Sequence, residues 1–322
     1  MKAAVYSENG GPEVLRYEDV PDPRVRAGEV LLRVAAVSVQ GGDLLHRQLV
    51  PFETAPHVVG YQAAGTVAAV GEGVTSVREG QRVVAFMPEG SHAELATAAE
   101  GHVYPVPDEL DLRLAAGIPV EFGTADECLF EFGGLRAGET VLVQAASSGV
   151  GLAAVQLAKA AGATVFGTAS SDPKLARLAE YGLDHGINFK CSEVVAAGLR
   201  RTGDRGVDLV VDPVGGRTLE GSVGALAYRG RISWVGQAGR DEQQPQLAPL
   251  MFKNASLNGV YLGGEFEHAP ERTRSVIERL IGRVAAGELT VVLDREFPLA
   301  EAAEAHRYIE SRAAFGRVLL IP

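Results

Sequence analysis

The segment from Gln144 to Gly151 combines small side chains and glycines in a pattern that could hold a phosphate group. It follows the apolar run at 140–145 and opens a helix-like stretch at 150–161. Main-chain amides at such a helix N-terminus bind pyrophosphate, and small residues let the backbone approach it. Ser148 stands where the usual G-x-G-x-x-G fingerprint has its second glycine. The segment predicts a dinucleotide site, the alternative being a tight turn without a ligand.

The residues after the next strand-like run indicate which dinucleotide would bind. An NAD-binding protein usually places an acidic side chain about 20 residues past the loop, on the ribose hydroxyls. Here the run ends GTASS, and the first acid, Asp172, precedes Pro173 as a helix N-cap would. Ser170 and Lys174 offer a hydroxyl and a cation, which suit a 2′-phosphate. We therefore expect NADP(H), unless Lys174 is only a solvated helix residue.

Strands alternate with helices through the middle of the chain, which predicts a doubly wound parallel sheet. The expected strands lie at 140–145, 164–169, 206–216, 230–236 and 256–262, and the expected helices at 150–161, 173–181, 193–200 and 217–228. The preceding part of the chain contains short strand-like runs at 29–39, 64–71 and 81–86, which predict a β-rich domain. The tail of the chain is too short to fold alone and should return to that domain. Its expected elements are a helix at about 270–286, a strand near 290–296, a helix at 298–311 and the closing strand GRVLLIP.

Composition and charge exclude several classes of partner. The net charge of −11 argues against a nucleic-acid partner and against an acidic membrane surface. The sequence shows neither a basic leader nor a long apolar segment, so we expect no signal peptide and no membrane span. Two separate cysteines, Cys128 and Cys191, fit a reducing compartment and cannot form a four-cysteine zinc site. We expect a cytoplasmic protein.

Several segments in a fixed order resemble a known family. They are LRAGETVLVQAASSGVGLAAVQLAKAAGA (135–163), GRISWVG (230–236), GRVLLIP (316–322), DLLHR (43–47), AAGTVAAVGEGVTSVREGQRVVAF (63–86) and GTAD (123–126). Together they are similar to the zinc-independent, zeta-crystallin-like quinone oxidoreductases of the medium-chain dehydrogenase/reductase superfamily, over essentially the whole chain. The resemblance implies an α/β fold in which a Rossmann NADP-binding domain (121–264) is inserted in a β-rich GroES-like catalytic domain (1–120 and 265–322).

The resemblance also bears on the metal, because zinc alcohol dehydrogenases share the superfamily. They bind catalytic zinc through a cysteine, a histidine and a second cysteine, and the matching positions here are Gln40, Tyr61 and Val120. Gln62 stands where those enzymes carry the glutamate of a Gly-His-Glu motif. This set offers no thiolate or imidazole, which zinc sites need. No metal is expected.

Without a metal, the resemblance implies reduction of a quinone or of the C=C bond of an α,β-unsaturated carbonyl by NADPH. The substrate oxygen gains negative charge, which a hydrogen-bond donor stabilises. Tyr61 and Gln40 occupy former metal-ligand positions and are the expected catalytic residues, with Tyr61 bonding the carbonyl. The alternative for Tyr61 is a ring packed where the domains join. Tyrosines usual in this family beside His46 and Arg47 are absent, which favours a specialised substrate.

Further contacts carry over from the family by position. Near the nicotinamide we expect Thr124, Tyr261 and Leu262, and on the pyrophosphate Ser147, Ser148, Gly149 and Val150. On the 2′-phosphate we expect Ser170, Lys174 and Arg312, with Phe189 in place of a tyrosine of that cluster. Gly236 and Gln237 should lie along the cofactor. Asp43 and Arg47 would form a polar link, either at the cleft edge or purely structural.

The apolar run 256–262 would form the edge strand of the sheet. Edge strands are hazardous when exposed, and pairing with a second subunit satisfies them. We therefore expect a homodimer through this strand. Two other functions remain open: a pathway-specific enoyl or keto reductase of secondary metabolism, and a non-catalytic, crystallin-like NADPH-binding protein.

Overall fold

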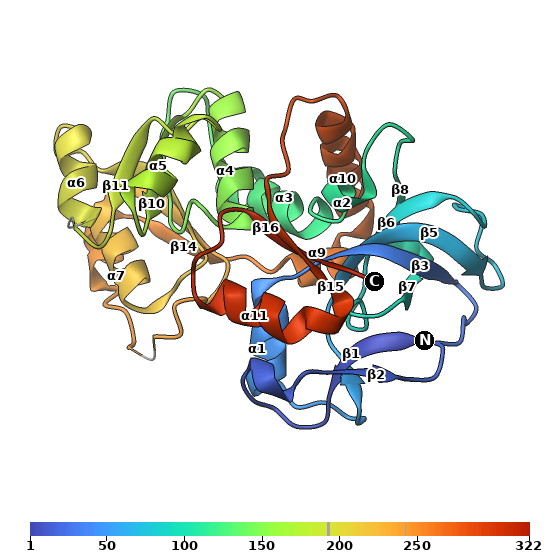
Figure 1. Ribbon diagram of the computed structural model, residues 1–322. Helices are drawn as coiled ribbons and strands as arrows, with labels where there is room; N and C mark the ends of the chain where they lie inside the picture. The colour runs from blue at the N-terminus through green and yellow to red at the C-terminus, as the bar shows by residue number, and fades with distance from the viewer. Residues whose placement is uncertain (192–193, 242) are drawn as a thin grey trace. The chain divides into compact units, whose positions relative to one another are not determined.

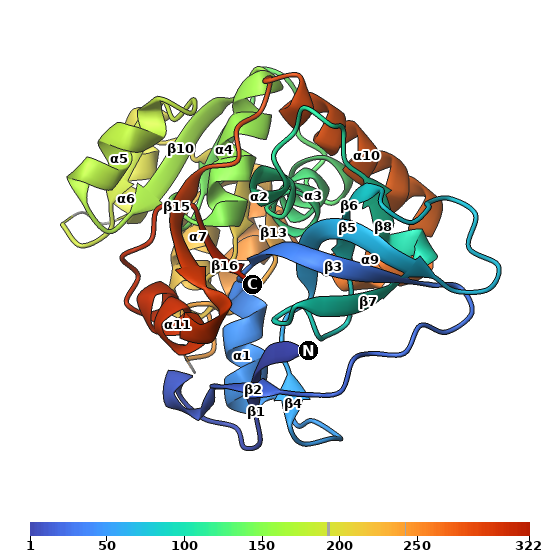
Figure 2. The same ribbon diagram turned by 45° about the vertical axis from the view of Figure 1, so that its right-hand side comes forward.

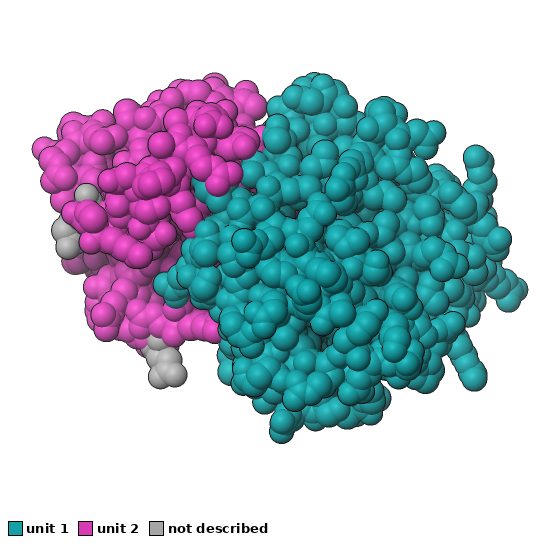
Figure 3. Space-filling view, in the orientation of Figure 1, with its two compact units in different colours: residues 1–120, 266–322 teal, residues 121–265 magenta. Residues whose placement is uncertain are grey.

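The computed structural model describes residues 1–191, 194–241 and 243–322, which form two compact units. Unit 1 comprises Met1–Val120 and Phe266–Pro322, and unit 2 comprises Glu121–Glu265 (Figure 3). Unit 2 is thus inserted in the sequence of unit 1. Among the described helices, none has both the length and the apolar character needed to span a bilayer.

Unit 2 is built on a six-stranded parallel sheet (Figure 1). Its strands are β9 (Thr140–Val143), β10 (Thr164–Ala169), β11 (His185–Asn188), β12 (Val207–Asp212), β13 (Leu226–Trp234) and β14 (Ser256–Gly259), in the order β11-β10-β9-β12-β13-β14. The chain starts in the middle at β9, fills one side of the sheet and then returns to β12 to fill the other. This is the predicted doubly wound arrangement, in which ligands bind where the strand order reverses.

The composition of the strands explains the parallel sheet. Val141–Val143 of β9 and Leu209–Val211 of β12 are fully buried, as expected for strands covered on both faces. The connecting helices of unit 2 are α4 (Gly149–Ala160), α5 (Asp172–Ala179), α6 (Val194–Arg201), α7 (Gly216–Ala225) and α8 (Ala248–Lys253). At the ends of unit 2 lie α3 (Pro119–Asp126), a π-helical turn (Glu127–Glu131) and α9 (Leu262–His268).

Several predicted boundaries of unit 2 were wrong. Ser171, not Asp172, takes the N-cap position of α5, and the Asp172 carboxylate accepts a hydrogen bond from Asn188 at 2.9 Å. The strand predicted at 256–262 ends at Gly259, because α9 begins at Leu262. The helix predicted at 217–228 ends at Ala225, where β13 takes over. For the helix predicted at 193–200, the first position lies outside the described residues.

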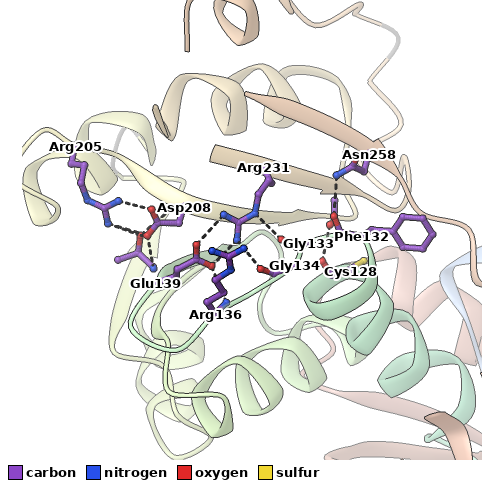
Figure 4. A network of polar contacts seen from close by, with 12 residues as sticks. Cys128, Phe132, Gly133, Gly134, Arg136, Glu139, Arg205, Asp208, Arg231 and Asn258 are labelled. Carbon is purple, nitrogen blue, oxygen red and sulfur yellow. Dashed lines mark hydrogen bonds and ion pairs between the residues drawn. The ribbon is translucent and has the colours of Figure 1, made fainter. Parts of the chain in front are cut away.

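A polar network fastens strands of this sheet to the segment that precedes β9 (Figure 4). Arg231 of β13 bonds both carboxylate oxygens of Glu139, at 3.0 and 2.6 Å, and donates from Nε to the Gly133 carbonyl at 2.7 Å. Asn258 of β14 donates to the Phe132 carbonyl at 3.0 Å. These bonds tie β9, β13 and β14 to the turn that follows the π-helical segment.

Unit 1 contains a seven-stranded sheet and a three-stranded sheet (Figure 2). The larger has the order β15-β16-β3-β5-β6-β8, with β7 also pairing with β3, and the smaller the order β2-β1-β4. The strands are β1 (Lys2–Tyr6), β2 (Arg16–Asp19), β3 (Glu29–Ser38), β4 (His57–Val58), β5 (Gln62–Val70), β6 (Arg82–Phe86), β7 (Leu95–Ala99), β8 (Val103–Pro105), β15 (Leu293–Pro298) and β16 (Arg317–Ile321).

The helices of unit 1 stand beside these sheets. They are α1 (Gly41–Leu49), α2 (Leu112–Ala115), α10 (Pro270–Ala285) and α11 (Ala302–Glu310), with short 3-10 turns at Pro12–Val14, Glu100–His102 and Leu299–Glu301. The closing strand returns to the β-rich part of the chain, as predicted: β16 pairs with β3 through Leu319 and Ser38. Leu32, Val37 and Leu320 are fully buried in the core that results.

Candidate functional site

The glycine loop of unit 2 forms a cap on the amino end of α4. Ser148 is the N-cap residue, and its Oγ accepts a hydrogen bond from the Gly151 amide at 3.1 Å. Its own amide donates to the Ala145 carbonyl at 2.9 Å, and Ala145 adopts a positive φ of 50°. A Cβ at Gly151 would collide with that carbonyl, so this glycine is required. The departure from the fingerprint at Ser148 therefore has a structural reason: the serine caps the helix.

A buried chain of hydrogen bonds supports this loop from below. Thr168, near the end of β10, donates to Gln144 at 2.8 Å and accepts from the Ala145 amide at 3.1 Å. Gln144 donates to Ser222 of α7 at 3.0 Å, and Ser222 donates to Asp212 at the end of β12 at 2.7 Å. All four polar side chains are at most 2% exposed. The chain joins the carboxyl ends of β9, β10 and β12 where the strand order reverses.

Asp212 also shapes the next loop. Its Oδ1 accepts from the Val214 and Gly215 amides at 2.9 and 3.0 Å, which turns the chain into α7. Gly215 lies against the predicted pair Gly236 and Gln237, since a Cβ on Gly215 would approach the Gly236 oxygen to 3.2 Å. The loops after β12 and β13 are thus brought together.

Sequence reasoning missed the supporting chain. The segment containing Asp212 was predicted only as a strand, and Thr168, Ser222 and the side chain of Gln144 received no role. The one available signal was the carboxylate of Asp212 at the end of an apolar run, followed by Pro213 and two glycines. An acid in that place needs several donors, and a tight glycine turn supplies main-chain amides.

The residues predicted for a 2′-phosphate in unit 2 gather at the carboxyl ends of β10 and β11. Ser170 directly follows β10, and Lys174 lies half-buried in the first turn of α5. Phe189 follows β11, where its amide donates to the Ala169 carbonyl at 3.2 Å and its side chain is 45% exposed. Arg312, the third predicted phosphate ligand, is an exposed residue of unit 1 that follows α11 with a φ of 60°.

The predicted nicotinamide residues lie at the two ends of unit 2. Thr124 is a buried residue of α3. Leu262 is buried at the start of α9, whereas the Tyr261 side chain is 77% exposed. The Tyr261 ring folds back over Gly263, where a Cβ would meet its Cζ at 2.5 Å.

In unit 1 the first turn of α1 brings Gln40 and Tyr61 into one region. Gln40 is the N-cap residue; its amide N–H donates to Asp43 at 2.7 Å and its side-chain Nε2 donates to the Ser38 carbonyl at 3.4 Å. Tyr61 lies over the next residues, because a Cβ on Gly42 would come within 2.5 Å of its hydroxyl oxygen. Its ring also meets Phe86 edge-on, at 6.1 Å between centroids.

Gln62 and Val120 are the other two positions compared above with the zinc enzymes, and Gln62 binds main chain. Gln62 is fully buried; its Oε1 accepts from the Val120 amide at 2.6 Å, and its Nε2 donates to the Ala116 carbonyl. Val120 contributes an aliphatic side chain that is 9% exposed. Gln62 therefore clamps the segment that leads into α3.

The expected link between Asp43 and Arg47 is not formed. Asp43 accepts from Gln40, while Arg47 is fully buried and donates to Gly10, His306 and Glu310. One helical turn separates the two side chains in sequence, but the guanidinium is drawn to α11 by the Glu310 carboxylate.

Comparison with known proteins agrees with this architecture. A family model described as "Alcohol dehydrogenase GroES-like domain" matches residues 26–108, and one described as "Zinc-binding dehydrogenase" matches residues 149–281. The quinone oxidoreductases of Rattus norvegicus and Pseudomonas aeruginosa are 33% and 34% identical, over the whole of this chain and 98% and 99% of theirs. The crystal structure of Escherichia coli quinone oxidoreductase complexed with NADPH superposes with a TM-score of 0.95 at 28% identity, covering both chains completely.

The chain belongs to the quinone oxidoreductase family of the medium-chain dehydrogenase/reductase superfamily. It is an oxidoreductase. The predicted family and fold are thereby confirmed, while the roles predicted for individual site residues remain predictions.

The buried chain under the glycine loop makes a testable prediction. Thr168→Val keeps the shape of the side chain but leaves Gln144 and the Ala145 amide without this partner. We expect the free energy of unfolding to fall by about 1–3 kcal/mol, the usual effect of unsatisfied buried polar groups. Equilibrium urea denaturation measures the change. Thr164→Val, in the same strand and only partly buried, is the matched control and should change stability by less than about 0.5 kcal/mol; equal effects at both positions would contradict the assignment.

Proposed function

We propose that this protein is an NADPH-dependent reductase that transfers hydride to a quinone or to the C=C bond of an α,β-unsaturated carbonyl without zinc. The observation that carries the proposal is the chemistry of the region around the first turn of α1. There Tyr61 and Gln40 offer hydrogen-bond donors where a zinc enzyme of the superfamily has metal ligands. The substrate is a small molecule, and the net charge of −11 disfavours nucleic acid.

The residues present do not fit a zinc ion. Gln62 already uses its amide on the main chain of Ala116 and Val120, and Val120 has no donor atom in its side chain. Among the described residues, no group of three or more His, Cys, Asp or Glu side chains could hold a metal. Catalytic zinc takes three protein ligands from cysteine, histidine and carboxylates. The proposed reaction therefore runs without a metal step.

The residues of unit 2 fit NADP(H). The α4 amino end, with Ser147, Ser148, Gly149 and Val150, would receive the pyrophosphate through main-chain amides. Ser170 and Lys174 would receive the 2′-phosphate, with Arg312 of unit 1 as a further cation. Thr124, Phe189, Gly236, Gln237, Tyr261 and Leu262 would complete the contacts, so unit 2 is assigned as the NADP-binding domain and unit 1 as the catalytic domain. NADPH supplies the hydride from C4 of its nicotinamide.

Tyr61 has the properties of the donor this reaction needs. Its hydroxyl lies over Gly42, next to the amino end of α1, where helix amides favour negative charge. A phenol in that place donates to the substrate oxygen as charge develops there, which stabilises the transition state more than the ground state. Gln40, at the start of the same helix, is proposed as the second polar contact.

The direct test is NADPH oxidation with 1,4-benzoquinone, 9,10-phenanthrenequinone and simple enones, set beside a saturated ketone and beside NADH. The proposal expects turnover with the quinones or enones, no turnover of the saturated ketone, and unchanged activity after dialysis against a strong chelator. Binding of NADPH without turnover of any acceptor would favour the crystallin-like alternative. Turnover restricted to one acyl or polyketide-type enone would favour a pathway-specific reductase. Loss of activity on chelation would overturn the metal-free mechanism.

Substitution of Tyr61 by phenylalanine tests the donor. Tyr61→Phe keeps the ring contact with Phe86 but removes the hydroxyl, so kcat should fall about 100-fold with little change in the dissociation constant of NADPH. Steady-state kinetics with a good acceptor and fluorescence titration with NADPH measure the two quantities. Tyr104→Phe, a buried tyrosine of β8, is the matched control and should retain kcat. Unchanged turnover in Tyr61→Phe would refute the role.

Lys174 tests the choice of cofactor. Lys174→Gln removes the cation proposed for the 2′-phosphate, so the dissociation constant of NADPH should rise about 10-fold or more while that of NADH stays constant. Lys159→Gln, at the last turn of α4 and paired with Asp184, is the control and should alter neither. An equal loss for NADPH and NADH would place Lys174 away from the 2′-phosphate.

A homodimer through β14 remains part of the proposal. The strand is shorter than expected, but it is still the sheet's edge and its backbone can pair with a second copy. Met251 and Phe252 of the preceding helix α8 are 69% and 77% exposed, which adds apolar surface next to the edge. Light scattering at micromolar concentration should give twice the chain mass of 33.8 kDa. A mass of one chain would refute the dimer.

A further inference from the structure

Unit 1 contains a buried chain of side chains that the reaction proposed above does not use. Arg47 of α1 lies 2.7 Å (Nη1 to Nδ1) from His306 of α11, and the His306 Nε2 lies 3.2 Å from the His92 Nε2. The His92 Nδ1 then lies 3.4 Å from the Ser91 hydroxyl. All four side chains are fully buried. Segments far apart in the sequence are therefore joined through two imidazoles.

The direction of every hydrogen bond in this chain follows from Arg47. A guanidinium only donates, so the Nδ1 of His306 must accept and its Nε2 must carry the proton. That N–H faces the Nε2 of His92, which must accept in turn, so the proton of His92 resides on Nδ1 and points to Ser91. Both imidazoles are neutral in this arrangement, and each exists as one defined tautomer.

Burial, joined at His306 by the charge of Arg47, keeps the two rings neutral. Burial lowers the pKa of His92 to about 3, and burial together with Arg47 and His92 lowers the pKa of His306 well below its usual value. Protonation of His92 would set its Nε2–H against the Nε2–H of His306, and protonation of His306 would set its Nδ1–H against the N–H of Arg47. The charged groups at the chain are Arg47 of α1 and Glu310 of α11, where Glu310 accepts from both Arg47 and Gln48. The Arg47 charge is thus balanced at the end far from His92.

The other end of the chain touches the backbone that precedes Tyr61. Gly60 has a φ of 103°, and a Cβ there would collide with the His92 Nδ1 and the Ser91 hydroxyl. The Ser91 amide donates to the Gly60 carbonyl at 2.9 Å, and the His92 amide donates to the Val59 carbonyl at 3.0 Å. The His92 ring and the Ser91 hydroxyl therefore pack directly against Gly60, the residue before Tyr61.

The same helix, α1, is held at both ends of this arrangement. Arg47, in its last turn, connects through the histidines to the backbone at Gly60, while the Tyr61 hydroxyl packs against Gly42 in its first turn. Hydrogen bonds and packing contacts together close a loop: helix, guanidinium, two imidazoles, Gly60, Tyr61 and helix again. Any loosening of the imidazoles would let the tyrosine and the helix shift against each other.

We propose that Arg47, His306 and His92 are positioning residues that fix Tyr61 against the amino end of α1 through a one-directional chain of neutral imidazoles. The inference rests on the donor role of Tyr61 stated above. It adds that the alignment of this donor depends on a defined tautomer at each histidine. No proton passes along the chain, because Arg47 does not give up its proton.

Nitrogen NMR of the imidazoles tests the chain without reference to activity. Long-range proton–nitrogen spectra of the uniformly labelled protein should show His306 protonated at Nε2 and His92 at Nδ1, with neither titrating between about pH 5 and 8. The opposite tautomers, or a charged ring within this range, would overturn the proposal.

A double-mutant cycle tests the connection to Tyr61. His92→Phe keeps a ring under Gly60 but removes the acceptor for His306, and should lower kcat about 10-fold with an unchanged dissociation constant for NADPH. His92→Gln restores an acceptor and a donor and should recover most of the loss. In a Tyr61→Phe background, His92→Phe should have no further effect on kcat, since it acts through the hydroxyl. His57→Phe, another buried histidine of unit 1 that packs on Tyr6 and Phe52, is the matched control and should leave kcat unchanged.

The outcomes separate this proposal from the proposed function. An equal loss of kcat in both backgrounds would show that His92 acts on the fold in general and would overturn positioning. If Tyr61→Phe alone leaves kcat unchanged, the donor role fails and the positioning role fails with it, while NADPH oxidation can still be observed. If His92→Phe does not fold, Arg47→Lys, which keeps the charge but loses the fork to Glu310 and His306, takes its place in the same cycle with the same expected result.

Discussion

The hydrogen bonds that run from Thr168 through Gln144 and Ser222 to Asp212 are the constraint on which the loops at the carboxyl ends of β9, β10 and β12 depend. A doubly wound sheet leaves its binding site where neighbouring loops diverge, and divergence by itself would leave the strand ends unsupported. Here four buried polar side chains bridge that gap, each with partners inside the chain. Because an unsatisfied member would be costly, the network holds in one arrangement. The network therefore fixes the positions at which the loops after these strands begin.

In unit 1, buried hydrogen-bonded polar groups likewise hold an element in place, here helix α1. Helix α1 is short, at nine residues, and such a helix has little stability of its own. Its amino end is held by Gln40 and Asp43, and its carboxyl end by the buried guanidinium of Arg47. Polar groups in both units are thus buried in fully directed hydrogen-bond chains. In both, the chain ends at a backbone segment that carries a proposed site residue.

Local sequence signals predicted the sheet but not what supports its site. Apolar runs and the glycine loop marked β9, β10 and α4 because burial and helix capping act between neighbours in sequence. The roles of Thr168, Ser222, His92 and His306 depend on contacts across 10 to 259 positions, and a serine or histidine alone does not reveal such a partner. The strand predicted at 256–262 is present but ends early, at Gly259: Val260 and Tyr261 have strand-like side chains, yet a helix begins at Leu262.

The proposed absence of a metal explains why positioning would matter here. A bound cation polarises a carbonyl over a range of geometries, because a point charge acts in every direction. A phenol donates along one O–H axis, and its contribution falls steeply when the axis is misaligned. An enzyme that relies on Tyr61 must therefore build rigidity around it from its own side chains. The close approach of the Tyr61 ring to Gly42 and the packing of the His92 imidazole against Gly60 are contacts that such rigidity requires.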